Sequence, residues 1–377
     1  MKIGMVSKYP PAEDGIGIYT ANLCEELTNA GVEVIKIGDK ESTSANYIID
    51  FKSFSLKSQL RQIVEKEKLD LLHIQYIAAH FGKWTLNLNL LLALGTLTMQ
   101  VPIVVTFHEV HTTAETIREK MLDLLQNQIT KKSAAVIAHT RQQKEFLQMK
   151  YKKKHAYTVH MGITPRPMHK LKDKKVLFLG MLNYGKGAEY LIMAIGDMPD
   201  YTLTVAGKAI NEEYERIIRA AAAENKHGNV KLDIRWLPEQ AKQKYLEEAD
   251  MMVLPYVWAP YQSAAVHDAF SYGIPVVVTD AGDIGEVVKE FICGRVVEQR
   301  SPKALAAGIK AVHGNYETYQ HGVAKYRKEA SWEKTAQTHA EIYNETLQQH
   351  YEKHGIPKKE KDRMKNENEQ PASSEEL

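Results

Sequence analysis

The stretch KVLFLGMLNYGKGAEYLIMAIGDMPDYTLTVA, residues 175–206, decides the fold. It begins with a short apolar run, continues through a glycine-containing loop and a longer amphipathic segment, and ends in a second short apolar run. Two strands connected through a helix lie parallel in one sheet, so the stretch predicts a βαβ unit. Open parallel sheets bind ligands at the carboxyl ends of their strands, which is where this loop falls.

The same alternation runs through the rest of the chain. Amphipathic segments between short apolar runs predict helices between strands, and hence an α/β fold with two successive Rossmann-like, doubly wound parallel-sheet domains. The most apolar segment, 86–99, is too short to cross a bilayer and predicts a buried helix. Strands are predicted at 2–6, 32–37, 70–74, 102–107 and 134–138 in the first half, and at 175–179, 201–206, 230–234, 251–254, 275–278 and 294–297 in the second.

Two prolines and a cluster of charges interrupt the periodic pattern between His160 and Lys174. This interruption places a domain boundary there, with an N-terminal domain at 1–165 and a C-terminal domain at 166–330. A segment of helical character follows at 331–355. The last stretch, 356–377, is charged, polar and almost free of large apolar side chains, which predicts a disordered tail.

The composition is that of an ordinary globular protein, with 44% hydrophobic and 25% charged residues among 377. The two cysteines, Cys24 and Cys293, lie far apart and outside any metal-binding spacing, so we expect neither a disulfide framework nor a zinc site. The first residues enter a strand without the pattern of a signal peptide, and we expect a cytoplasmic protein.

The net charge of +2 is unevenly spread. Residues 144–175 hold nine lysines and one arginine against only Glu145 and Asp173. A solvated helix face and linker would explain this cluster, and peripheral contact with an anionic membrane, at its inner face, or with an acidic acceptor is the alternative. Nucleic acid is not expected as a partner, because no aromatic residues are interleaved with the cations.

Two loops of the first half carry candidate site residues. Gly15 and Gly17 open the helix after the first strand and would let a ligand approach its N-terminus, although a purely structural turn explains them as well. Thr20 replaces the third glycine of a dinucleotide-binding motif, which weakens an oxidoreductase interpretation. His108 and Glu109 follow the fourth predicted strand and could orient a hydroxyl, whereas a metal site there would lack an evident third ligand.

The second half is more specific. Gly180, Gly185, Lys186 and Gly187 lie between a strand and a helix, where an ammonium beside open backbone N–H groups suits a diphosphate. A later helix is predicted to start near Ser263 among small residues, including Ala264 and Ala265, which would leave its N–H groups accessible. Asp268, one turn along, could accept hydrogen bonds from ribose hydroxyls or form an ordinary salt bridge.

Taken in order, these pieces resemble family 4 of the retaining glycosyltransferases, which have the GT-B fold of two Rossmann-like domains facing a cleft. The resemblance covers nearly the whole chain before the tail, and even SWEKTAQTHAEIY resembles the final segment that crosses back onto the first domain in this family. The matching stretches are the loop around Gly15 and Gly17, HIQY at 73–76, VTFHE at 105–109, HMGI at 160–163, GKG at 185–187 and SYGIPVVVTDAGDIGEVV at 271–288.

The resemblance implies that the first domain binds a sugar or lipid-linked acceptor and the second a nucleotide diphosphate sugar, with no further cofactor. Lys186 matches the diphosphate lysine, and His108 matches the histidine near the reacting sugar, with Glu109 on the acceptor side. Asp268 falls where the second glutamate of the family's glutamate pair holds the ribose. Two loops would line the donor, one with Gly15 and Gly17 and the other with Gly185, and Ser263, Ala264 and Ala265 would present backbone donors to the diphosphate.

Two departures from the family pattern leave alternatives open. Met181 stands where an arginine usually precedes the lysine, and Pro260 stands at the first glutamate of the pair. The resemblance implies a retaining, metal-independent glycosyltransferase of cell-envelope, polysaccharide or glycolipid synthesis. A nucleotide-sugar-binding pseudoenzyme or scaffold, and an epimerase or phosphorylase on the same fold, remain alternatives.

Overall fold

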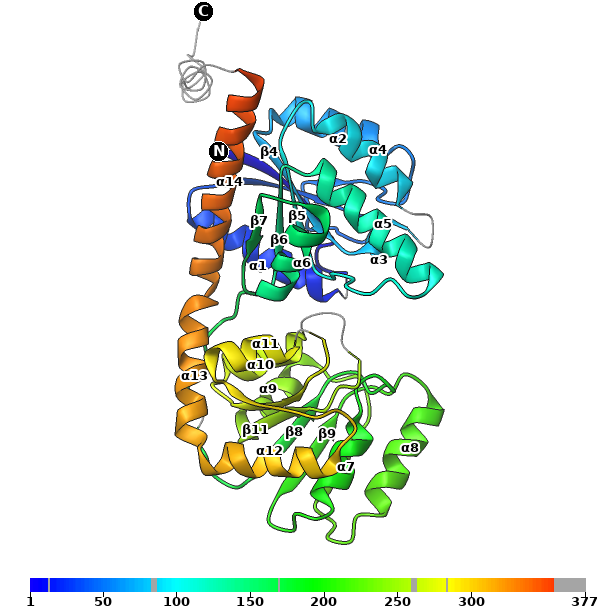
Figure 1. Ribbon diagram of the computed structural model, residues 1–377, viewed down its shortest axis with the longest axis vertical. Helices are drawn as coiled ribbons and strands as arrows, with labels where there is room; N and C mark the ends of the chain where they lie inside the picture. The colour runs from blue at the N-terminus through cyan, green and yellow to red at the C-terminus, as the bar shows by residue number, and fades with distance from the viewer. Residues whose placement is uncertain (13, 83–86, 169, 259–262, 283, 356–377) are drawn as a thin grey trace, which may run out of the picture.

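The computed structural model describes residues 1–12, 14–82, 87–168, 170–258, 263–282 and 284–355. Within them the chain forms two α/β domains, one above the other in Figure 1. The first is built from β1 Lys2–Val6, α1 Gly15–Asn29, β2 Glu33–Gly38, β3 Tyr47–Ile48, α2 Leu56–Glu67, β4 Leu71–Tyr76, α3 Ala78–Phe81, α4 Leu88–Leu97, β5 Ile103–Phe107, α5 Ile117–Lys132, β6 Ala135–Ala138, α6 Arg141–Tyr151 and β7 Ala156–Thr158.

The second domain continues the alternation as far as its last strand, after which three helices follow one another directly. The elements are β8 Lys175–Leu179, α7 Ala188–Ile195, β9 Thr202–Ala206, α8 Glu212–Ala223, β10 Val230–Asp233, α9 Glu239–Glu248, β11 Met251–Leu254, α10 Ala264–Ser271, β12 Val276–Thr279, α11 Ile284–Phe291, β13 Gly294–Val297, α12 Pro302–Gly314, α13 Tyr316–Glu329 and α14 Trp332–His354.

Each domain is organised around one parallel sheet. The strand order is β3-β2-β1-β4-β5-β6-β7 in the first and β10-β9-β8-β11-β12-β13 in the second, which confirms the predicted α/β fold class. The connections leave in opposite directions from β1 and β4, and again from β8 and β11. Such switch points open a crevice beyond the carboxyl ends of the strands, so the loops after β8 and β11 face the same crevice.

Alternating side chains explain how the first sheet is covered on both faces. Leu71 of β4 packs in the cluster that includes α1 and α14, whereas the next residue, Leu72, packs in the cluster that includes α2 and α4. Both side chains are fully buried, as expected for a parallel sheet between two helix layers. The second domain has its own apolar cluster, centred on β8, β11 and β12.

Two sequence-based expectations need correction. The edge strands β3 and β7 were not predicted, because they have only two and three residues and lack a continuous apolar run. Helix α4 lies within the segment predicted at 86–99, but it is buried on one face only: Leu88 is 48% exposed and Leu92 is 54% exposed. The helix packs on α2 and α5, and its remaining apolar face points to solvent.

The two domains are joined by the returning chain and by a direct polar contact. In Figure 1, α13 runs beside the second domain, and the long helix α14 continues along the first domain, where it packs on α1. Glu286 on α11 accepts hydrogen bonds from the backbone N–H groups of Arg141 and Gln142, at 2.8 and 3.2 Å, at the start of α6. The guanidinium of Arg141 also lies 2.9 Å from Glu290.

The polar tail predicted at 356–377 lies outside the described residues. Among the described helices, none is long and apolar enough to cross a membrane.

Candidate active site

The loop between β8 and α7 is held against the segment that follows β11. Gly187 has a positive φ of 61°, and a Cβ at that position would lie 2.4 Å from the carbonyl oxygen of Pro255. The carbonyl oxygen of Gly185 accepts hydrogen bonds from the backbone N–H groups of Val257 and Trp258, at 3.0 and 3.2 Å. Both glycines therefore fix the position of Lys186 between them.

Lys186 lies over an aromatic ring that the sequence analysis did not single out. Its ammonium nitrogen is 3.6 Å from the centre of the Tyr256 ring, a cation–π contact, and Tyr256 is almost completely buried. Burial lowers the pKa of Lys186 to about 8. The sequence around Tyr256, VLPYVW, carries no signal that separates such a platform from an ordinary core tyrosine.

Tyr256 also reaches the start of α10. Its hydroxyl is 2.9 Å from Oγ of Ser263, the N-cap residue of this helix, and the Ser263 side chain makes no capping bond to the helix backbone. Ala264 at the first turn is exposed and Ala265 is partly buried. Tyr256 thus places the lysine loop beside the positive end of a helix, where an anion is stabilised.

Asp268 lies one turn further along α10. It is exposed to solvent, yet protein atoms crowd around it, and this desolvation together with the charge of Glu239 raises its pKa to about 6, against the opposing charge of Lys242. Met181, at the position of the family arginine, is 54% exposed. Pro260, the other departure from the family pattern, lies outside the described residues.

In the first domain, the glycine loop has two different surroundings. Helix α1 begins at Gly15, and its N-cap residue Asp14 accepts a hydrogen bond from the backbone N–H of Gly17 at 2.9 Å. A Cβ at Gly17 would lie 3.1 Å from the carbonyl oxygen of Lys8, whereas no atom lies within 4 Å of a Cβ at Gly15. Close packing therefore explains the glycine at position 17, whereas a side chain at position 15 would point into open space.

His108 lies at the carboxyl end of β5 and is buried. Its Nε2 atom is 2.7 Å from Oε1 of Gln75, and its Nδ1 atom is 3.3 Å from Nε2 of His139. Burial, and then the neighbouring histidines, lower the pKa of His108 well below its ordinary value, so the ring is neutral. No group of three or more His, Cys, Asp or Glu side chains suited to a metal ion is found among the described residues.

Glu109 follows His108 and lines a pocket of about 380 Å³ on the first domain. Burial raises the pKa of Glu109, while nearby His80 and Arg118 oppose this shift. One part of the pocket wall is apolar and another is charged. The lining residues are Lys52, Ala78, Ala79, Gly82, Asn87, Glu109, His111, Arg118, Met121, Leu122 and Leu125.

The structure brings the histidines of the first domain close to α10. Burial, followed by the nearby rings of His139 and His160, lowers the pKa of His267 on α10 to about 3. Since His139 contacts His108, the imidazole of His108 and helix α10 lie in one neighbourhood. Lys186 is connected to the same helix through Tyr256.

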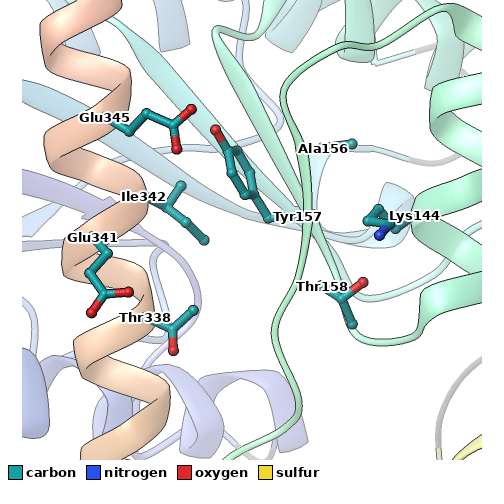
Figure 2. A pocket seen from close by; sticks show the side chains of 8 residues that line it. All are labelled: Lys144, Ala156, Tyr157, Thr158, Thr338, Glu341, Ile342 and Glu345. Atoms are coloured by element: carbon teal, nitrogen blue, oxygen red, sulfur yellow. The ribbon is translucent and has the colours of Figure 1, made fainter.

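A second pocket lies elsewhere, between the edge strand β7 and the crossing helix α14. Figure 2 shows Tyr157 of β7 pointing toward Glu345 of α14, with Thr158 and Thr338 further along the groove. Burial, and then a hydrogen bond to Glu345, raise the pKa of Tyr157. The residues that line this groove include none of the predicted site residues.

Comparisons with known proteins identify the family. Residues 14–166 match the family described as Glycosyltransferase Family 4, and residues 164–329 match the family described as Glycosyl transferases group 1. The two matches adjoin and together cover both domains. The chain belongs to the glycosyltransferases of family 4.

Two relatives from Methanocaldococcus jannaschii carry the same description. The uncharacterized glycosyltransferase MJ1607 is 27% identical over 179 residues, 45% of this chain and 45% of its own length. The chain therefore spans less than half of that relative. The uncharacterized glycosyltransferase MJ1178 is 23% identical over 92% of this chain and 98% of its own length.

A solved structure shares the whole two-domain fold. Anabaena HepE in complex with UDP superposes with a TM-score of 0.68 at 16% identity, covering 92% of this chain and 100% of that one. The same protein has been solved with UDP-glucose, with a TM-score of 0.68 at 15% identity. At this level of identity the likeness shows the fold, which is GT-B.

Proposed function

We propose that this protein transfers a sugar from a nucleotide diphosphate donor to a hydroxyl of an acceptor, with retention of the anomeric configuration. The observation that carries the proposal is the contact of Tyr256 with both Lys186 and Ser263, which gathers an ammonium and a helix N-terminus at the switch point of the second sheet. Negative charge develops on the diphosphate as it leaves, and this positive environment stabilises it.

Each donor-side residue has a distinct role in this proposal. Lys186 and the first amides of α10, at residues 263–265, bind the diphosphate and supply the positive charge without a metal ion, and Asp268 accepts hydrogen bonds from the ribose. Gly15 and Gly185 keep the backbone open beside the donor. The UDP and UDP-glucose complexes of HepE support a nucleotide-sugar donor.

The acceptor is proposed to bind on the first domain, in the pocket beside His108 and Glu109. Its mixed apolar and charged lining suits a sugar or lipid-linked acceptor. In the reaction, the bond between the anomeric carbon and the phosphate oxygen breaks, and the acceptor oxygen bonds to that carbon. The acceptor proton passes to the departing phosphate oxygen, so no protein nucleophile is required.

One observation favours a second candidate, a protein that binds nucleotide sugars without turning them over. Met181 is 54% exposed at the position of the family arginine, so the donor diphosphate would meet a thioether there in place of a second cation. Lys186 and the start of α10 would still bind the donor in this case.

Thermal-shift measurements over a panel of nucleotide sugars test the proposal first, because a bound ligand stabilises the fold by about 2.7 kcal/mol at a hundredfold excess over its Kd. Transfer to a panel of sugar and lipid acceptors is then measured with EDTA present, and the anomeric configuration of the product is read by NMR. We expect transfer to survive EDTA with retention. Activity that returns only with a divalent ion would contradict the metal-free part, an inverted product would contradict retention, and binding without any transfer would favour the second candidate.

A further inference from the structure

A continuous row of buried polar groups crosses the first domain beneath the candidate site. It starts at Tyr343 on α14, passes through β4 and β5, and ends at the carbonyl of Val159. The separations are 2.7 Å from the Tyr343 hydroxyl to His73 Nδ1, 3.3 Å from His73 Nε2 to Gln75 Nε2, 2.7 Å from Gln75 Oε1 to His108 Nε2, 3.3 Å from His108 Nδ1 to His139 Nε2, and 2.9 Å from His139 Nδ1 to the Val159 oxygen.

Counting hydrogens along this row exposes a conflict at one contact. The Val159 carbonyl can only accept, so Nδ1 of His139 carries a hydrogen and Nε2 of the neutral ring has a lone pair. If Oε1 of Gln75 accepts from His108, then Nε2 of His108 carries the hydrogen and Nδ1 has a lone pair. The two lone pairs would face each other at 3.3 Å.

Two changes could remove the conflict. One extra proton would make an imidazolium, but burial lowers the pKa of both His108 and His139, and the histidines that surround His108, namely His73, His80 and His339, add no negative charge. The ring of Tyr19 on α1, edge-on at 5.3 Å, adds none either. The other change is a half-turn of the Gln75 amide, which exchanges its oxygen and nitrogen with almost no change in shape.

The half-turn satisfies every group in the row with all three rings neutral. The Gln75 amide nitrogen then donates to His108 Nε2, His108 Nδ1–H donates to His139 Nε2, and His139 Nδ1–H donates to Val159. On the other side, His73 Nε2 donates to the Gln75 oxygen or to Thr106, whose hydroxyl is 2.8 Å away, and His73 Nδ1 accepts from Tyr343. Only a weak contact of the amide nitrogen with the Met5 sulfur, at 3.3 Å, is lost.

We propose that Gln75 and His139 are positioning residues that hold His108 as a neutral imidazole with its hydrogen on Nδ1, through a row of hydrogen bonds that all point from α14 toward Val159. Both ring nitrogens of His108 are then occupied, so the ring does not exchange protons with substrate. It acts as a fixed neutral group that sets the end of β5 and the adjoining Glu109. Its effect on transfer rests on the proposed function, whereas the hydrogen positions do not.

The hydrogen positions can be read directly from the protein labelled with nitrogen-15 in histidine. Ring nitrogen shifts and their couplings to ring hydrogens distinguish the two tautomers and the imidazolium, and the His108→Asn variant assigns the signal. We expect His108 to be neutral with hydrogen on Nδ1 from pH 6 to 9. Hydrogen on Nε2 in the native protein, in either charge state, would overturn the inference.

The Gln75→Glu variant tests whether this arrangement matters for transfer. At pH 8 a carboxylate can only accept, so it draws hydrogen to Nε2 of His108, and we expect kcat to fall at least tenfold while the donor KM stays within twofold. The same change at Gln126, which is buried on α5 outside the row, measures what a buried glutamate costs in stability. A folded Gln75→Glu protein with native kcat would refute the positioning role. If the native tautomer is as expected but no donor is ever transferred, the proposed function fails and the assigned hydrogen positions stand.

Discussion

The polar centres of the two domains are built in opposite ways. In the first domain, His108 and its neighbours are buried, neutral and hydrogen-bonded to one another. In the second domain, Lys186 and Asp268 are charged groups whose pKa values are displaced toward neutrality, to about 8 and about 6. The first centre is complete without a ligand. The second disfavours its own charges until a partner of suitable charge and hydrogen-bonding capacity arrives.

This difference suggests a division of labour. A satisfied network resists rearrangement and keeps the backbone around His108 in one place. A partly desolvated ammonium beside a helix N-terminus gains most when a diphosphate enters, because the same low-polarity surroundings that penalise an isolated charge strengthen its attraction to an opposite one.

The largest expected effect is at Lys186. Replacing it by methionine removes the ammonium but keeps the length of the side chain, and we expect kcat/KM to fall at least a hundredfold, about 2.7 kcal/mol. The folded-state pKa of Lys186 lies below its unfolded value, so the charged lysine costs stability below about pH 8, and this cost fades as the pH rises toward 10.5. Lys186→Met should therefore have an equal or higher Tm at pH 7.

Turnover and thermal unfolding of this variant are compared with those of Lys310→Met, an exposed lysine on α12. The control should change neither quantity measurably. A folded Lys186→Met protein with native turnover and native donor affinity would show that the diphosphate does not bind at this loop. The proposed contrast between the two domains would then fail as well.

The first domain should respond to mutation in the reverse manner. Tyr343→Phe deletes only the hydroxyl that bonds His73 and leaves a buried ring nitrogen without its partner. We expect the free energy of unfolding to drop by about 1–3 kcal/mol, with donor affinity unchanged. Chemical denaturation and calorimetric titration with a nucleotide sugar measure the two quantities, and an altered donor affinity at unchanged stability would argue against a self-contained network.

The pH dependence of donor affinity separates the two charged groups of the second domain. Ribose binding needs the Asp268 carboxylate, which is lost as the pH falls through about 6, and diphosphate binding needs the Lys186 ammonium, which is lost as the pH rises through about 8. One unit beyond either value, affinity should be roughly tenfold lower. Calorimetry between pH 5 and 9 should therefore give a bell-shaped dependence of donor affinity on pH. The Asp268→Asn variant should bind the donor more weakly, and its affinity should no longer fall on the acid side. A curve that is flat in the native protein would exclude both assignments.

The smallest expected effect concerns the basic segment 144–175. Lys150, Lys152 and Lys154, in and just after α6, are exposed, and each well-placed cation contributes at most ~1 kcal/mol to binding an anionic surface. We expect co-sedimentation with anionic vesicles at low salt that is reduced when all three become glutamine, whereas Lys310→Gln has no effect. Equal recovery of the protein with anionic and neutral vesicles would exclude an anionic membrane as a partner of this segment.

Much of the architecture could be predicted because a buried parallel strand leaves a continuous apolar run. The runs at 2–6, 175–179, 251–254 and 294–297 match β1, β8, β11 and β13 residue for residue. The short edge strand β7 has no such run, because it has only three residues and its outer edge faces solvent and α14 instead of another strand. The exposed face of α4 also escaped prediction, because an all-apolar segment does not reveal which of its sides will lack a covering layer.

The site was predictable only where chemistry is confined to a short segment. The GKG sequence indicated a lysine in a glycine-containing loop between a strand and a helix, because these residues lie next to one another in the chain; that this lysine binds an anion stays a prediction. Gln75, His139, Tyr256 and Tyr343 lie on separate elements. Gln75 and Tyr343 fall within stretches that resemble the family, HIQY and SWEKTAQTHAEIY, but that resemblance assigned them no role. Their importance comes from partners that are far away in sequence, and no local pattern encodes such a pairing.

The sequence by itself therefore determined the α/β class, the two-domain order and the presence of Lys186 in an open loop, because local periodicity and short-range spacing suffice for these. Tertiary structure alone decided that Tyr256 joins this lysine to α10, that the hydroxyl of Tyr343 on α14 meets His73, and that His108 is buried with both ring nitrogens engaged. Burial and proton positions depend on which groups meet across the fold, and this is set only when the two sheets and the crossing helix have packed.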